Sequence, residues 1–243
     1  MNTREVQAAL SLLGYPLVVD GAMGPKTRTI VQTFQRGAGL AADGIVGPLT
    51  VAAIQAAVAK KEAAGQPRAR ELVPADWMPS AQLNRVIVHW TAGAHRASGL
   101  DRSHYHILIE GDGKLVRGFP SIDKNDARGV KPGYAAHTLN CNSGSIGVSL
   151  CCMAGAIESP FKAGSAPMTR EQGEALPAVL ADLCRRYAIP VTPSTVLSHA
   201  EVQGTLGIKQ RGKWDISRLA FDPSVMGAKA CGDLIRGSAL ALV

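Results

Sequence analysis

The fold of this chain is decided by the stretch Arg85-Val86-Ile87-Val88-His89-Trp90-Thr91-Ala92-Gly93. Its three consecutive β-branched apolar residues predict a short strand that is buried on both faces. The strand ends in His89, and a turn of small residues follows it. A rigid element therefore holds one imidazole at the rim of a sheet. A single histidine in such a place is more often a structural core residue than a ligand, so its role depends on partners elsewhere in the chain.

The sequence around this strand predicts a mixed sheet. Further strands are expected at residues 105–110, 115–119 and 146–150, and Asp112-Gly113 is typical of a hairpin turn between the first two of these. A long helix is expected at 170–187, and a last helix at 224–235. Strands interspersed with helices, with little βαβ regularity, indicate an α/β fold with a mixed sheet flanked by helices.

The long helix carries its own start signal. Thr169 is the expected N-cap, and Gln172 completes a capping box. Pro177 lies inside the helix and predicts a kink or an early break there.

Composition and charge exclude several classes of protein. The chain has 243 residues, and 46% of them are hydrophobic, which suits a globular protein with a sizeable core. It contains no apolar run of about 18 residues, so we expect no stable membrane insertion. The net charge of +7 is spread along the chain without a basic stripe, which argues against nucleic acid as a partner. The positive net charge would equally suit binding to a polyanionic cell wall.

The cysteines and the first residues indicate where the protein is made. Five cysteines, an odd number without CxxC spacing, predict reduced thiols rather than a disulfide framework or a cysteine zinc knuckle. Residues 1–5 lack the basic start and the apolar segment of a secretory signal. We therefore expect a protein made in the cytoplasm without a signal peptide.

A sequence repeat organises the first sixty residues. The pattern D-G-x-x-G-P-x-T-x-x-x-x-Q begins at Asp20 and again 23 residues later at Asp43. Asp-Gly favours a tight turn, and the proline suits the first turn of a helix. Helices are expected at about 3–13, 25–36 and 48–63, which together make a small three-helix bundle.

This doubled pattern resembles the peptidoglycan-binding type 1 domain, a three-helix wall-targeting module, over nearly all of residues 3–58. The alternative is a generic helical bundle with two similar turns. The two aspartates are expected to form turns rather than to contact a ligand. The predicted organisation is a peptidoglycan-binding helical domain at 1–62, a linker at 63–79 and a catalytic domain at 80–243.

Partners for His89 are found much later in the chain. His199 ends another short apolar run, and Asp215 follows in a Lys213-Trp214-Asp215 segment. Two imidazoles and one carboxylate would make a three-ligand zinc site with an open fourth position, as in catalytic zinc centres. Spacing alone is weak evidence for this site, because the sequence contains no short zinc motif.

Residues from about 83 to 219 resemble the type 2 N-acetylmuramoyl-L-alanine amidase family, which shares its fold with peptidoglycan recognition proteins. The similar pieces occur in family order: Ile87-Val88-His89-Trp90-Thr91-Ala92, Tyr105-His106-Ile107-Leu108-Ile109, Ala136-His137, Asn142-Ser143-Gly144-Ser145-Ile146-Gly147-Val148, Ser198-His199-Ala200-Glu201 and Lys213-Trp214-Asp215.

The resemblance implies a Zn²⁺ ion held by His89, His199 and Asp215, with Tyr105 and Lys213 as catalytic residues. It implies that zinc activates a water molecule that attacks the amide between N-acetylmuramic acid and L-alanine. The strand at 146–150 lacks the glutamate that some family members place there, so a carboxylate base is not expected.

Other positions carry weaker expectations. Thr91, His137 and Asn142 are candidate substrate contacts, although His137 is equally open to a structural role. His106, in the middle of an apolar run, is expected to form structural hydrogen bonds. The alternative to a catalytic role for Lys213 is that it is only a surface charge.

The sequence as a whole predicts a monomeric phage or prophage endolysin that acts on peptidoglycan in the periplasm after release from the cytoplasm. The rivals are a cytoplasmic enzyme that recycles soluble muropeptides and a non-catalytic recognition protein. A wall-binding module has no purpose in the first rival, and loss of a zinc ligand is the usual mark of the second.

Overall fold

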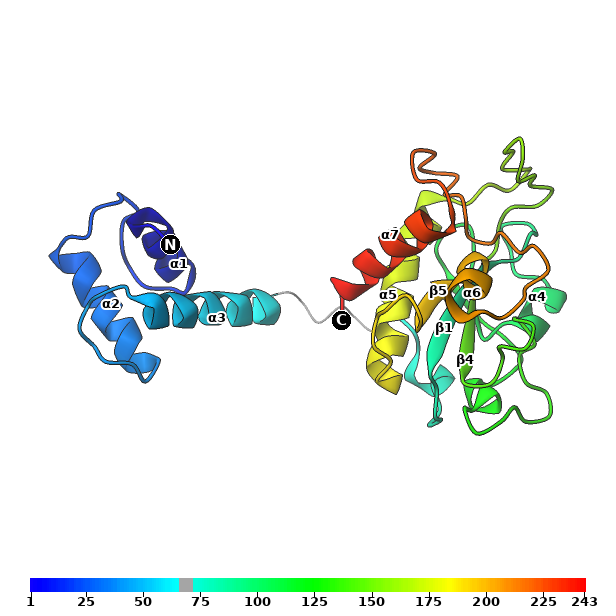
Figure 1. Cartoon of the computed structure of the whole chain (residues 1–243), viewed down its shortest axis with the longest axis horizontal. Coiled ribbons are helices and arrows are strands. Elements are labelled where there is room, and N and C mark those ends of the chain that lie inside the picture. Colours follow the sequence, from blue (N-terminus) through cyan, green and yellow to red (C-terminus); the bar gives the residue numbers. More distant parts are fainter. Residues whose placement is uncertain (66–71) are drawn as a thin grey trace. The chain divides into compact units, whose positions relative to one another are not determined.

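The computed structural model describes residues 1–65 and 72–243, and it divides into two compact units, Met1–Arg70 and Glu71–Val243 (Figure 1). Part of the predicted linker, residues 66–71, lies outside the described residues. None of the described helices is long and apolar enough to cross a membrane.

The first unit is a bundle of three helices, α1 (Thr3–Leu12), α2 (Pro25–Gly37) and α3 (Pro48–Gly65). Asn2 caps α1 and forms a capping box with Glu5, while Pro25 occupies the first turn of α2. Apolar side chains spaced three to four residues apart meet in a small core. Its fully packed members are Val6, Leu10, Val31, Phe34 and Ile54.

Two buried glutamines hold the repeated turns of this unit. Nε2 of Gln7 donates to Oδ1 of Asp20 (2.7 Å), and its Oε1 accepts the N–H of Gly21 (2.7 Å). Gln35 makes the same contacts with Asp43 (2.8 Å) and Gly44 (2.9 Å).

Each aspartate also accepts the N–H two residues later, so both act as turn formers, as expected. Of the downstream glutamines of the repeat, Gln32 is half-buried and Gln55 is exposed. The glutamines that hold the turns precede Asp20 and Asp43 at unequal spacing, so the repeat pattern does not contain them.

The second unit is built on a five-stranded mixed sheet in the order β3-β2-β4-β1-β5. Strand β1 (Arg85–Trp90) lies parallel to its two neighbours, β4 (Ser145–Leu150) and β5 (Val196–Ser198). Strand β2 (Ile107–Ile109) is parallel to β4, and the edge strand β3 (Leu115–Arg117) is antiparallel to β2. The predicted mixed α/β fold is confirmed.

Helices pack on the sheet, as Figure 1 shows: α4 (Gly99–His104), α5 (Arg170–Tyr187), α6 (His199–Leu206) and α7 (Ala228–Leu240). Short 3-10 turns lie at Ala75–Trp77 and Ile122–Asn125. Helix α5 has the predicted bounds and capping box and continues through Pro177. Helix α7 starts later than the predicted 224–235, because Gly227 has a φ of 94°, outside the helical range.

Successive residues of β1 face opposite sides of the sheet. Val86, Val88 and Trp90 pack in the main core, which also contains apolar residues of α5 and α7, whereas Ile87 packs in a smaller cluster with Leu197 and α6. By this alternation His89 lies on the Ile87 face, on the same side as α6.

The segment 72–79, predicted as linker, packs on the second unit instead. The backbone N–H groups of Leu72 and Val73 donate to Oδ2 of the buried Asp182 at 2.6 and 2.9 Å. Val73 and Met78 are buried in the core. The predicted linker therefore extends too far: residues 72–79 are largely apolar, and Val73 and Met78 anchor them in this unit.

Candidate metal centre

The three side chains expected as metal ligands lie together at the carboxyl edge of the sheet. One ligand atom from each of His89, His199 and Asp215 lies within 4.8 Å of the others, and all three residues are buried. Nδ1 of His89 and Nδ1 of His199 lie 3.1 and 3.2 Å from the same atom, Oδ2 of Asp215. The sheet register explains the meeting of the histidines: Val88 pairs with Ser198, so the next residue of each chain segment is a histidine.

Gln210 determines which nitrogen of His199 carries the hydrogen. Its Nε2 donates to the carbonyl groups of Leu139 (2.9 Å) and Ile208 (3.3 Å), which can only accept. Its Oε1 therefore faces His199, 2.9 Å from Nε2 of the ring. Because Oε1 is also only an acceptor, Nε2 of His199 must donate. In the neutral ring the lone pair then lies on Nδ1, which faces Asp215.

A second chain of hydrogen bonds gives His89 the same tautomer. Nε2 of His137 lies 3.3 Å from the carbonyl oxygen of Ser145 and must donate, so Nδ1 of His137 is an acceptor. Nε2 of His89 lies 3.2 Å from that Nδ1 and 3.3 Å from Oγ1 of Thr138. Donation from His89 to His137 satisfies both rings and leaves the lone pair of His89 on Nδ1. Burial lowers the pKa of His89 to about 4, so the ring is neutral near pH 7.

These donors and acceptors fit a divalent cation. The ordinary pKa of an aspartate lies far below 7, so Asp215 supplies a carboxylate oxygen, which lies between the two Nδ1 atoms. Two nitrogen lone pairs and one carboxylate then face one another. Among the described residues, only the two histidines lie within ion-pair distance of Asp215, so its buried charge has no lysine or arginine partner. Zinc accepts this mixture of nitrogen and oxygen ligands, and the residues therefore fit the expected ion.

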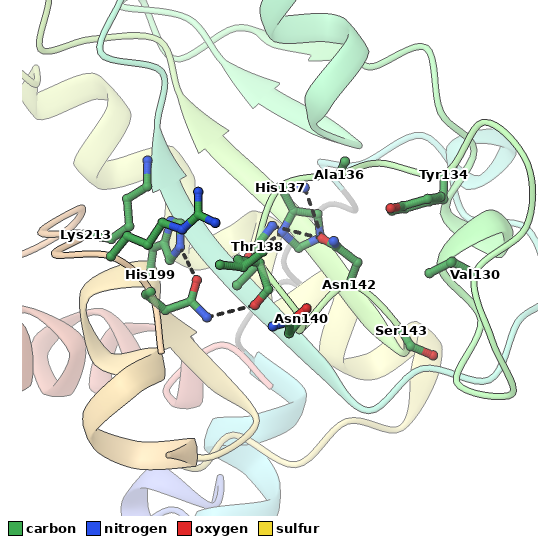
Figure 2. A pocket seen from close by; sticks show the side chains of 13 residues that line it. Val130, Tyr134, Ala136, His137, Thr138, Asn140, Asn142, Ser143, His199 and Lys213 are labelled. Carbon is green, nitrogen blue, oxygen red and sulfur yellow. Dashed lines mark hydrogen bonds between the residues drawn. The ribbon is translucent and has the colours of Figure 1, made fainter. Parts of the chain in front are cut away.

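An open pocket of about 610 Å³ lies beside the cluster (Figure 2). Its lining includes four of the predicted site residues, His137, Asn142, His199 and Lys213. Lys213 is exposed and lies on the His199 side of the pocket, across from Tyr134. Of the candidate ligands, His199 therefore borders a space that is open to solvent.

Two of the lining residues also have structural roles. The His137 ring packs so closely on β4 that a Cβ at Gly147 would lie 2.6 Å from it. Oδ1 of Asn142 accepts the backbone N–H groups of His137 and Thr138 at 3.0 and 2.9 Å. Asn142 therefore shapes the loop that places His137 behind His89.

Tyr105 and Thr91 are not among the residues that line this pocket. The centroid of the Tyr105 ring lies 5.1 Å from that of His89, and burial raises the pKa of its phenol, which stays protonated. Oγ1 of Thr91 accepts the N–H of Gly93 at 3.1 Å and so shapes the turn after β1. Tyr105 is therefore close to the candidate ligands, whereas the contact that Thr91 makes is with its own loop.

The structure adds residues that the sequence did not reveal. Gln210 and Thr138 contact the candidate ligands, yet each lies in a loop without periodic pattern or motif. His106 is buried and bonded to Asn125 and to the N–H of Gly147, which agrees with the structural role expected for it. All five cysteines are buried free thiols.

Comparison with known proteins gives two family matches. Residues 79–216 match the N-acetylmuramoyl-L-alanine amidase family, and residues 2–54 match a peptidoglycan binding domain. The zinc D-Ala-D-Ala carboxypeptidase of Streptomyces albus G is 36% identical over 92 residues, which are 36% of this chain and 32% of the relative. The chain therefore spans about a third of the length of that relative.

Two solved amidase structures are also similar. The endolysin amidase LysCS of Clostridium intestinale URNW has 17% identity and a TM-score of 0.33, covering 56% of this chain and 94% of its own. The E. coli amidase AmiD, solved with anhydro-N-acetylmuramic acid-L-Ala-D-γ-Glu-L-Lys, has 20% identity and a TM-score of 0.34, covering 50% of each chain.

Proposed function

The chain belongs to the N-acetylmuramoyl-L-alanine amidase family, and from that premise we propose that it hydrolyses the amide between N-acetylmuramic acid and L-alanine in peptidoglycan with the help of zinc. One observation carries the proposal: two imidazole lone pairs and a buried carboxylate converge on one point beside an open pocket. The substrate class we propose is a muramoyl peptide with the L-Ala-D-γ-Glu sequence, as in the AmiD complex.

Zinc held by His89, His199 and Asp215 would supply a Lewis acid that activates water and polarises the scissile carbonyl. The chain's own groups do the rest. The Lys213 ammonium, exposed at the pocket, would stabilise the developing oxyanion, a contribution of about 3 kcal/mol for one such donor. Tyr105, with a protonated phenol beside His89, would orient the water or donate a proton to the leaving amine.

We further propose that the first unit targets the enzyme to the wall and that the chain acts as an endolysin, reaching peptidoglycan after release from the cytoplasm. The peptidoglycan binding domain match supports the targeting role. All three candidate ligands are present and converge, which disfavours a non-catalytic recognition protein.

Product analysis tests the reaction. Purified sacculi digested with the full chain should release stem peptides that begin with L-alanine and leave glycan strands without peptides. Mass spectrometry of both fractions measures this. Release of new reducing sugar ends would show a glycosidase and reject the proposal.

Replacing Gln210 by methionine should weaken zinc binding by about 10- to 100-fold, because the His199 ring is then free to place its hydrogen on Nδ1. Competition with a chromophoric chelator at fixed pH measures the affinity. Asn140→Gly is the matched control, since Asn140 lines the same pocket and has a φ of 54° that glycine tolerates. Equal affinities for wild type and Gln210→Met would show that Gln210 does not orient the ligand.

A further inference from the structure

One wall of the pocket carries two positive side chains close together in sequence. Arg211 and Lys213 both line the pocket and both are exposed. Within residues 72–243, neither has a carboxylate within ion-pair distance. The described residues that line the pocket include no aspartate or glutamate. The pocket therefore presents uncompensated positive charge to whatever enters it.

The backbone that carries these two cations is anchored on both sides. Gln210, immediately before Arg211, is buried and bonded to His199 and Leu139. Trp214, after Lys213, packs edge-on against Trp90 with ring centroids 4.7 Å apart. The contacts of Gln210 and Trp214 thus fix the backbone from which the two cationic side chains extend.

Arg211 also has an uncommon backbone conformation. Its φ is 53°, and that of the next residue, Gly212, is 69°. Left-handed backbone at a non-glycine residue is unfavourable, and such residues cluster at functional sites. Asparagine or glycine would fit this turn better than arginine, so turn geometry alone does not account for the residue.

The proposed substrate offers one carboxylate near the scissile bond. A γ-linked glutamate leaves its α-carboxylate outside the peptide bond, and in L-Ala-D-γ-Glu this group lies two residues beyond the bond that is cut. Two extended residues span at most about 7 Å. Arg211 and Lys213 line the same pocket as the candidate ligand His199, so a substrate bound there can contact all three side chains.

We propose that Arg211 binds this free α-carboxylate, so that the enzyme selects stem peptides with an acidic second residue over peptides in which this group is amidated. The inference rests on the proposed function. Arg211 is assigned to the binding of this group because its fork can make two parallel hydrogen bonds to a carboxylate, whereas the single ammonium of Lys213 cannot.

The test compares two soluble substrates, muramoyl-L-Ala-D-γ-Glu-L-Lys and the same peptide with the α-carboxamide. For wild type we expect kcat/KM to favour the acid on the order of tenfold, as one charged hydrogen-bonded contact at an exposed site would give. Arg211→Asn, which suits the left-handed backbone, should bring the ratio to within about twofold. Lys209→Ala is the matched control: Lys209 is exposed and nearby but does not line the pocket, and its ratio should stay at the wild-type value.

A ratio unchanged in Arg211→Asn, or equally reduced in Lys209→Ala, would overturn the inference. Calorimetric binding of the free peptides L-Ala-D-γ-Glu-L-Lys and its carboxamide separates this outcome from failure of the proposed function. If wild type cleaves neither substrate but binds the acid more tightly, and Arg211→Asn abolishes that preference, the carboxylate site stands and the reaction is wrong. Thermal unfolding of each variant verifies that it is folded.

Discussion

Asp215→Ala should lower kcat/KM for amide hydrolysis by at least about 1000-fold and should abolish stoichiometric zinc binding. The variant removes the sole carboxylate of the cluster and leaves two imidazoles, whose combined affinity for zinc is far lower. Zinc content by mass spectrometry and hydrolysis of a soluble muramoyl peptide measure the two effects. Asp215→Cys, which supplies a thiolate ligand, should recover zinc and part of the activity.

Two controls separate the metal from other effects. Asp222→Ala, in the same unit and outside the pocket lining, should keep both zinc and activity. The inactive Asp215→Ala protein should still sediment with sacculi, because the proposed wall-binding unit is intact. Full activity in Asp215→Ala would remove this residue from the ligand set, and loss of sedimentation would contradict targeting by a separate unit.

Local pattern was enough to predict the strand that carries His89 and the helix α5. Val86 to Val88 are all apolar, so the run favours a buried strand. Thr169 and Gln172 form a capping box whose contacts lie within one helical turn. Signals of this kind depend on near neighbours in sequence, so they can be read before the fold is known.

The environment of the ligands could not be predicted in this way. Gln210 reaches His199 only because its amide also meets the carbonyl of Leu139, a residue far away in sequence. The helix α6 was missed because its eight residues follow an apolar run that predicted a strand ending at His199. The contact of Gln210 depends on the tertiary fold, whereas α6 carries a local start signal, the capping box of Ser198 and Glu201, that the strand interpretation left unused.

The glutamines of the first unit show the same limit. The repeat at Asp20 and Asp43 was visible because its spacing is constant, whereas Gln7 and Gln35 precede the two turns at different distances. The contact between each glutamine and its turn fixes their distance in space. It does not fix the number of residues between them in the sequence.

A buried ion pair between Glu201 and Arg236 stabilises the segment that carries His199. Glu201, near the start of α6, accepts the N–H of Ser198 at 2.8 Å and receives two hydrogen bonds from Arg236 at 2.8 and 3.1 Å. Arg236 also donates to the carbonyl of Val196 at 2.9 Å. Gly232 leaves room for the pair, because a Cβ there would lie 2.2 Å from the Glu201 carboxylate. One arginine on α7 therefore joins the end of β5 to the helix that begins with His199.

Arg236→Met is accordingly expected to reduce the free energy of unfolding of the second unit by about 3–5 kcal/mol, since it leaves the buried Glu201 carboxylate without its partner. Adding Glu201→Gln should recover much of the loss, because glutamine can still accept the N–H of Ser198 without burying a charge. Urea unfolding followed by tryptophan fluorescence reports this unit alone, as Trp77, Trp90 and Trp214 all lie in it.

The matched control is Lys229→Met on the same helix, whose ion pair with Asp233 is exposed and should contribute at most about 1 kcal/mol. If Arg236→Met costs no more than this control, the buried pair does not stabilise the unit. If it costs the expected amount, the double variant decides the cause: recovery identifies the unpaired charge of Glu201, whereas no recovery identifies the bond from Arg236 to the carbonyl of Val196, which both variants lack. In either case the loss should weaken zinc binding as well, because the end of β5 and the start of α6 place His199 beside His89.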